Sequence, residues 1–105
     1  MAPVKYRITA KAAEDLENIW LYTRAHWSVE QADRYLGLLF DEFNHLAAAP
    51  AAGFDRSHIR PGYRCSFVKS HVVFYRVSEQ NGHVDVIRVL HQRMDMEGHL
   101  REPPG

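Results

Sequence analysis

The stretch that decides the fold is an alternating apolar run that ends in charged side chains: Val84-Asp85-Val86-Ile87-Arg88-Val89-Leu90-His91-Gln92-Arg93-Met94-Asp95. Its first part has the composition of a buried β-strand, because β-branched residues recur along it. Its last part places a histidine, an arginine and an aspartate directly after that strand. A small domain can carry a working surface there, since the strand fixes the position of the polar groups that follow.

Two more strands are predicted upstream of this one. Tyr63 to Lys69 alternates between apolar and polar side chains, and Val72 to Val77 is apolar on both faces. Ser70-His71 separates the two runs, and Asn81-Gly82, which is typical of type I′ turns, precedes the last strand. Consecutive strands joined by short turns predict an antiparallel meander.

The first half of the chain predicts one short strand and two helices. Val4 to Thr9 alternates and is expected to join the meander, because a lone strand would leave its backbone groups unpaired. Thr9 can cap a first helix, and Ser28-Val29-Glu30-Gln31 fits the capping box of a second helix, which Pro50 ends. So short a break between the two helices predicts an antiparallel hairpin.

The predicted fold class is therefore α+β, with an antiparallel sheet of about four strands, the N-terminal strand plus the meander, packed against the helix hairpin. Residues 1–105 are expected to form one domain, with 101–105 as a frayed tail. Pro50 to Gly62 is expected to be a loop. One sheet face should pack on the helices, and the other is too apolar for solvent, so we expect it to be covered or to bind a partner.

The charge of the chain excludes no class of partner by itself, since 13 Lys+Arg balance 13 Asp+Glu. Its distribution is uneven. From position 56 to position 78 no acidic residue occurs, and the basic residues there are Arg56, Arg60, Arg64, Lys69 and Arg76. This pattern indicates a local basic surface, which is either a solvated strand face and loop or the rim of a binding surface.

The cysteine and histidine content argues against a disulfide and against a metal. Cys65 is the only cysteine, and its place in a strand predicts a buried, unreactive thiol in a reducing compartment. The seven histidines lack the spacing of a metal site, so we expect neither a metal nor another cofactor. The N-terminus has no signal-peptide pattern, and no apolar stretch reaches the length of a membrane span. A cytoplasmic protein is expected.

One set of residues has the chemistry for cleaving an RNA backbone. His91 could act as acid or base, while Arg64 and Arg93 could hold the phosphate. The period of a strand places Arg88 on the face opposite His91, which removes Arg88 from this set. The simpler structural alternatives are a salt bridge from Arg88 to a helix acid and a turn or helix cap formed by Asp95.

The order of motifs along the chain resembles that of ParE-type toxins of the RelE/ParE superfamily, the toxin half of bacterial type II toxin-antitoxin pairs. No single motif is specific, but together they cover nearly the whole chain. They are Tyr6-Arg7-Ile8-Thr9, Ala13, Asp15-Leu16, Ile19-Trp20, Tyr22-Thr23, Trp27, Gln31-Ala32, Leu46-Ala47 with Pro50, Arg60-Pro61-Gly62-Tyr63-Arg64, His71-Val72-Val73-Phe74-Tyr75-Arg76, and Arg88-Val89-Leu90-His91-Gln92-Arg93-Met94-Asp95 with His99-Leu100.

The resemblance implies a toxin that a small ParD-like antitoxin wraps and neutralises, with two toxins per antitoxin dimer or a higher assembly. It further implies inhibition of DNA gyrase in the bacterial cytoplasm, without catalysis, membrane association or sequence-specific DNA binding by the toxin. The alternative is a ribosome-dependent mRNA endoribonuclease of RelE type, with His91, Arg64 and Arg93 in catalytic roles. The chain has no tyrosine after His91 and only Lys69 as a lysine after position 11, so the gyrase interpretation leads.

Candidate contact residues fall into two groups. The candidates for contact with the target lie in the basic segment and the C-terminal segment: Arg56, Arg60, Arg64, His91, Arg93, Met94 and Asp95. The candidates for contact with the antitoxin are aromatic residues of the helices and of the middle strand: Trp20, Trp27, Tyr35, Phe74 and Tyr75. For the two tryptophans, packing in the core or between the helices is the simpler expectation.

Overall fold

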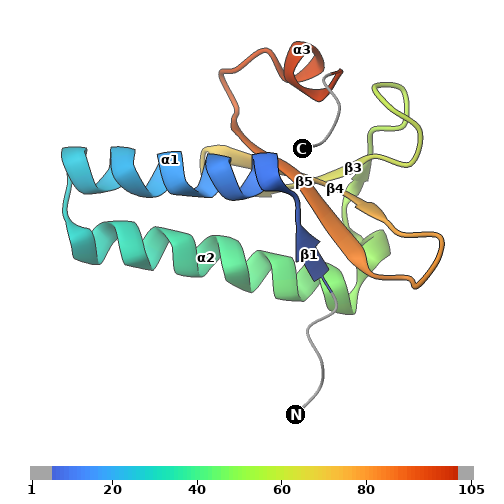
Figure 1. The fold of residues 1–105 in the computed structure, drawn as a ribbon, viewed down its shortest axis with the longest axis horizontal. Coiled ribbons are helices and arrows are strands. Elements are labelled where there is room, and N and C mark those ends of the chain that lie inside the picture. Colours follow the sequence, from blue (N-terminus) through green and yellow to red (C-terminus); the bar gives the residue numbers. More distant parts are fainter. Residues whose placement is uncertain (1–5, 102–105) are drawn as a thin grey trace.

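The computed structural model describes residues 6–101. Its elements, in chain order, are β1 (Tyr6–Ile8), α1 (Ala10–His26), α2 (Val29–Ala48), the 3-10 turn η1 (Pro50–Ala52), β2 (Phe54–Asp55), β3 (Arg64–Val68), β4 (His71–Val77), β5 (Val84–His91) and α3 (Met96–Leu100). Figure 1 shows the two long helices side by side, with the sheet at the end where α1 begins. Positions 4 and 5 of the predicted first strand and 102–105 of the predicted tail lie outside the described residues.

The helix hairpin forms as predicted, because both helices begin at side-chain caps. The Thr9 hydroxyl accepts a hydrogen bond from the amide of Ala12 at 3.1 Å, and the Ser28 hydroxyl accepts one from Gln31 at 3.0 Å. Pro50 follows the end of α2 and cannot continue the helical hydrogen bonds. Within residues 6–101, neither helix is long and apolar enough to cross a membrane.

The sheet has five strands in the order β1-β5-β4-β3-β2. The meander β3-β4-β5 is antiparallel, as predicted, but β1 lies parallel to β5, so the prediction of a wholly antiparallel sheet is wrong. No tight turn joins β1 to β5, because both helices and the other three strands intervene, and hairpin geometry therefore does not set its direction. The predicted loop from Pro50 to Gly62 contains η1 and the short edge strand β2.

A bulge in β5 decides which side chains reach which sheet face. Tyr75 pairs with Val86, whereas the preceding Phe74 pairs with Arg88, so Ile87 is an additional residue in the ladder. Without it, Arg88 would share a face with Val86 and point at the helices. With it, Ile87 joins the cluster on the opposite face, and Val89 returns to the helix-side core. Arg88 pairs with Phe74 of that opposite face, and its guanidinium reaches the Asp15 carboxylate of α1.

The two sheet faces support two separate cores. On the helix side, side chains of α1 and α2 pack on the strands: Leu16, Leu39, Phe43, Leu46, Val73, Tyr75, Val84, Val86 and Val89. On the other side the cluster is Tyr63, Cys65, Val72, Phe74, Ile87, Leu90 and Leu100, with Ile59 and Met96 packed against it. The apolar second face is thus covered in large part by the chain itself. Phe74 and Tyr75, both predicted as antitoxin contacts, are fully buried within these two clusters.

The predicted turn at Asn81-Gly82 is of a different type. Gly82 has a φ of 71°, but Lys69 is the only non-glycine residue with positive φ in the described part of the chain. A type I′ turn needs positive φ at both central positions, so this turn is not type I′. The β4–β5 connection is instead a longer loop, which the amide of Ser78 closes by donating to the carbonyl of His83 at 2.8 Å.

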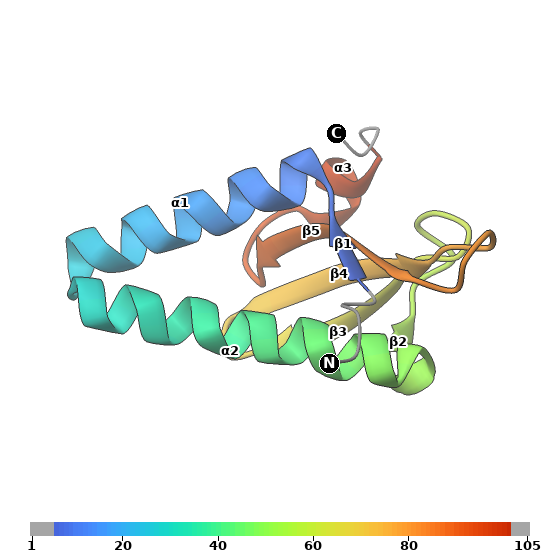
Figure 2. The ribbon, with the colours of Figure 1, turned by 60° about the horizontal axis from the view of Figure 1, so that its bottom comes forward.

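Two polar side chains fasten η1 to the sheet (Figure 2 shows α2 ending beside β2 and β3). The Tyr75 hydroxyl donates to the Pro50 carbonyl at 2.7 Å and accepts from the Gly53 amide at 3.0 Å. The Arg64 guanidinium donates to the carbonyls of Ala51, at 3.1 Å, and Gly53. Gly53 has no room for a side chain, because a Cβ there would collide with the Tyr75 hydroxyl and lie 2.6 Å from a β3 carbonyl oxygen.

Gly53→Ala is therefore expected to destabilise the fold by about 2 kcal/mol, the usual cost of overpacking a close contact. Gly37→Ala is the matched control, because a Cβ at Gly37 meets nothing within 4 Å and the residue lies inside α2. It should stabilise the fold by about 0.5–1 kcal/mol through the better helix propensity of alanine. Urea unfolding followed by circular dichroism measures both, and equal effects of the two variants would contradict the predicted collision.

Candidate functional site

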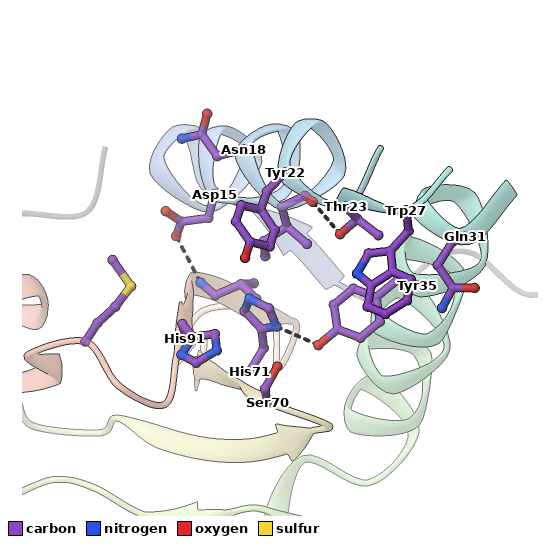
Figure 3. Close-up of a pocket in the computed structure, with 13 residues that line it drawn as sticks. Asp15, Asn18, Tyr22, Thr23, Trp27, Gln31, Tyr35, Ser70, His71 and His91 are labelled. Carbon is purple, nitrogen blue, oxygen red and sulfur yellow. Dashed lines mark hydrogen bonds between the residues drawn. The ribbon is translucent and has the colours of Figure 1, made fainter. Parts of the chain in front are cut away.

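A cleft of about 680 Å³ lies between the helix hairpin and the ends of β4 and β5. Figure 3 shows Tyr22, Trp27 and Tyr35 around it, with His71 and His91 on the side formed by the strands. Tyr22 and Trp27 are 63% and 76% exposed, which is unusual for large aromatic side chains. The walls of the cleft are thus aromatic and open, while its floor is polar.

Hydrogen bonds fix the polar floor of the cleft. The Tyr35 hydroxyl lies 2.6 Å from Nδ1 of His71, and the ring of His71 lies edge-on to that of His91, with centroids 5.3 Å apart. Nδ1 of His91 accepts a hydrogen bond from the amide of Arg93 at 3.1 Å. In neutral His91 this bond places the proton on Nε2. The two imidazoles face the cleft as hydrogen-bonding groups rather than as a metal site, and no metal-binding cluster of three or more ligands occurs among residues 6–101.

His71 is held neutral by its surroundings. The pKa of His71 is lowered from 6.5 to about 4, mainly by burial and also by the neighbouring His91, while Asp15 acts in the opposite direction. At neutral pH the His71 side chain is therefore an uncharged partner of Tyr35. The floor of the cleft is suited to a ligand with an apolar body and hydrogen-bonding groups, not to a strongly charged one.

Four of the predicted contact residues line this cleft: Trp27, Tyr35, His91 and Met94. Trp27 lies at the tip of the hairpin and is exposed, so the expectation that it packs in the core is wrong. Trp20 is not part of the cleft. Its indole donates to Asp33 of α2 at 2.9 Å and so joins the two helices. This agrees with the expectation that Trp20 packs between the helices.

The other predicted contact residues lie elsewhere. Asp95 caps α3, since its carboxylate accepts from the amide of Gly98 at 3.2 Å, and Arg93 lies exposed in the segment between β5 and α3. Arg60 donates to the carbonyl of Arg101 at 3.2 Å, and Arg56 donates to the carbonyl of the preceding residue at 2.9 Å. Arg60 thus joins the basic segment to the end of α3, whereas His91 and Met94 of the C-terminal segment line the cleft.

The predicted nuclease set does not assemble. Arg64 pairs with Tyr75 on β4, whereas His91 pairs with His71, four residues away along the same strand. At a rise of about 3.3 Å per residue, the Cα atoms of Arg64 and His91 are at least about 13 Å apart. The Arg64 guanidinium is also engaged with the carbonyls of η1, so its position is explained by structure alone.

The sequence interpretation missed several cleft residues, among them Ile19, Tyr22 and His71. A helical stripe would have found the first two, because Asp15, Ile19 and Tyr22 follow one another at i, i+4 and i+7. His71 was assigned to a turn, but the turn is at Lys69-Ser70 and His71 begins β4. No local signal brings β4 and α2 together, so the Tyr35–His71 bond was not predictable from spacing.

The low pKa of His71 makes stability depend on pH in a defined window. The unfolded chain binds a proton at His71 as the pH falls below about 6.5, while the folded chain binds it only near pH 4. The stability that neutral His71 contributes is complete above pH 6.5 and is lost as the pH falls toward 4. Allowing for solvent screening of this half-buried group, we expect a loss on the order of 1–2 kcal/mol.

Urea unfolding between pH 7 and pH 4 should therefore show a shallower loss of stability in His71→Asn than in the unchanged chain. Asn retains a hydrogen-bonding group near the Nδ1 position but does not titrate. His58→Asn, in an exposed loop position, should retain the steeper dependence. Parallel curves for His71→Asn and the unchanged chain would contradict the assignment.

Comparison with known proteins gives a consistent result. Residues 6–96 match the family described as the ParE toxin of type II toxin-antitoxin system, parDE. Toxin ParE1 of Mycobacterium tuberculosis is 44% identical over 96 residues, covering 91% of this chain and 97% of that protein. Toxin ParE1 of Caulobacter vibrioides is 42% identical over 95 residues, covering 90% and 96% of the two chains, and Toxin ParE of Escherichia coli is 34% identical over 99 residues, covering 92% and 93%.

The fold has a counterpart among solved structures. A chain of the structure titled "Chromosomal ParDE TA system from P. aeruginosa" superimposes with a TM-score of 0.71 at 20% identity, covering 84% of this chain and 95% of that one. At this identity the likeness concerns the fold alone. The family match and the curated relatives, each spanning nearly the whole length, carry the assignment. The resemblance inferred from the motifs is thereby confirmed: the chain belongs to the ParE family of type II toxin-antitoxin toxins.

Proposed function

We propose that this ParE-family toxin inhibits DNA gyrase when it is free, and that a ParD-like antitoxin neutralises it by binding the cleft. The observation that carries the proposal is the exposed aromatic pair at the mouth of the cleft, Tyr22 and Trp27. Exposed apolar surface of this kind is costly in an isolated small domain and is typical of a partner-binding site. The proposed complex forms in the bacterial cytoplasm, with two toxins per antitoxin dimer or in a higher assembly.

The cleft has the properties of a groove for an amphipathic segment. Leu21 of α1 and Val29 at the start of α2 are also exposed, so the outer half of the hairpin carries apolar surface besides Tyr22 and Trp27. A partner helix or extended segment could place apolar side chains against Trp27 and Tyr35. Polar groups of the same segment would meet the imidazoles of His71 and His91, which would set its orientation.

The segment from His91 to Asp95 is the proposed contact with gyrase, together with Arg56 and Arg60. Asp95 holds the segment in place by capping α3, while Arg93 and Met94 remain exposed. Arginine and methionine are enriched in protein interfaces, where they combine a charge or a polarisable sulfur with apolar area. Because Arg64 and His91 are far apart, this surface is better suited to protein recognition than to RNA cleavage.

Purified toxin, added in excess to gyrase and relaxed plasmid, is expected to block supercoiling and to accumulate cleaved DNA complexes. Prior mixing with the cognate antitoxin should abolish both effects. Arg93→Ala should weaken the inhibition about tenfold or more, as expected for an interface anchor, while Arg34→Ala on the exposed side of α2 should not. An unchanged supercoiling rate at excess toxin would reject the gyrase target. Transcript cutting on translating ribosomes that His91→Ala abolishes would establish the nuclease alternative instead.

Trp27→Ala should reduce the affinity for the antitoxin about 10- to 100-fold, because a large aromatic anchor contributes on the order of 1.4–2.8 kcal/mol. The stability of the toxin should change little, since Trp27 is mostly exposed. Phe67→Ala is the matched control: Phe67 is also exposed but lies on β3, outside the cleft. Isothermal titration calorimetry distinguishes the two, and an equal loss of affinity for both variants would place the antitoxin elsewhere.

A further inference from the structure

A row of charged side chains crosses the sheet near the β4–β5 loop, on the face away from the helices. Arg7 of β1 pairs with Asp85 of β5, and Arg76 of β4 pairs with the same Asp85. The adjoining residues Val86 and Tyr75 pack in the helix-side core, so the alternation of the strands turns the charged row to the opposite face. Figure 2 shows β1, β5 and β4 lying side by side.

One buried carboxylate orients two exposed guanidinium groups in this row. Nε of Arg7 donates to one oxygen of Asp85 at 3.2 Å, and Nε of Arg76 lies 3.7 Å from the other oxygen. The side chain of Asp85 is only 12% exposed, whereas those of Arg7 and Arg76 are 63% and 46% exposed. A single arginine would neutralise Asp85, so the second leaves a net positive charge that is held in place at the surface.

The positive charge continues toward β3. Tyr63 immediately precedes β3 and continues the register next to Arg76, and the guanidinium of Arg60 lies over the Tyr63 ring at 6.0 Å from its centroid. Arg60 is itself positioned by its bond to the carbonyl of Arg101. Since no acidic residue occurs between positions 56 and 78, nothing in that part of the chain offsets the charge of Arg60 and Arg76.

We propose that this row, Arg7, Arg76 and Arg60, binds the phosphate backbone of nucleic acid without reading its sequence. Guanidinium groups bind phosphate through paired N–H donors, and prior orientation by Asp85 reduces the entropy lost on binding. Neighbouring strands lie about 4.8 Å apart, so Arg7 and Arg76 start about 10 Å from each other across β5. A row of this length fits consecutive phosphates of a polyanion better than one small anion.

This proposal goes beyond the function proposed above, because it concerns the sheet face away from the cleft and a different class of ligand. The test uses the full chain and a fluorescein-labelled DNA duplex of random sequence, with anisotropy measured over a series of salt concentrations. Three phosphate contacts predict a slope of log K against log salt of about −3. Arg7→Gln/Arg76→Gln should weaken binding at least about tenfold at low salt and reduce the slope by about 2.

Two controls separate phosphate contact from loss of charge or of fold. Arg24→Gln/Arg34→Gln removes the same charge from the helix hairpin and should keep the slope of the unchanged chain. Arg7→Lys/Arg76→Lys keeps the charge and should also keep the slope, with lower affinity. Thermal unfolding checks each variant. If the double glutamine variant does not fold, Arg60→Gln alone should still reduce the slope by about 1.

Absence of binding at low salt, or a slope that the Arg7→Gln/Arg76→Gln change leaves intact, would overturn the proposal. An acidic peptide that binds the row more tightly than DNA of equal charge would also overturn it, and would assign the row to a protein partner. None of these results bears on the cleft, because Trp27 and the antitoxin are tested by separate variants.

Discussion

The ion pair between Asp15 and Arg88 is the contact on which the placement of the helices depends. The two side chains meet through paired bonds at 2.8 and 3.0 Å, and the same carboxylate accepts the amide of Val89 at 3.0 Å. β1 ends at Ile8, and beyond it no strand among residues 6–101 pairs with this edge of β5. The carboxylate of Asp15, on α1, therefore accepts the Val89 amide in place of the carbonyl of a neighbouring strand. The bonds of Thr9 to the carbonyls of Val86 and Ile87 do the same six residues earlier in the chain.

This arrangement explains why a cleft exists at all. α1 is tied to β5 by its first turns and then continues past the sheet, with α2 beside it, so the tip of the hairpin has no strand beneath it (Figure 2). Asp15 marks the inner end of the cleft, and Trp27 marks its outer end. Breaking a buried ion pair from one side costs about 3–5 kcal/mol, because the remaining charge is left without its partner. The geometry of the cleft and the stability of the fold thus rest on the same bond.

The parts of the fold that were predictable from the sequence are those set by nearby residues. Thr9 and Ser28 act on amides three positions away, and the strands of the meander are joined to their neighbours in sequence. The salt bridge of Arg88 to a helix acid and the cap formed by Asp95 were both among the alternatives, because each satisfies a group that would otherwise be unpaired. These interactions require no knowledge of how distant segments meet.

The errors arose where distant segments meet. The direction of β1 depends on a pairing 78 residues away, as in the contact of Arg7 with Asp85. The bulge at Ile87 changes the face of every later residue of β5, and a regular alternation cannot reveal it. Phe74 is buried in a cluster with Leu100 of α3 and Tyr63 before β3, residues that no local pattern connects with it. His71 went unnoticed as a cleft residue for the same reason, since it lies on the sheet while its partner Tyr35 lies on α2.

The parallel pairing of β1 with β5 also has a consequence for how the toxin is made. The first strand is paired by the last, so the β1–β5 pairing and the Asp15–Arg88 bond can form only after nearly all described residues have left the ribosome. Pairings of such high sequence separation fold slowly compared with local ones. Until β5 has been synthesised, β1 and the first turns of α1 therefore lack the partners that hold them in the folded toxin. The complete fold, and any activity that depends on it, therefore exists only once synthesis of the chain is nearly finished.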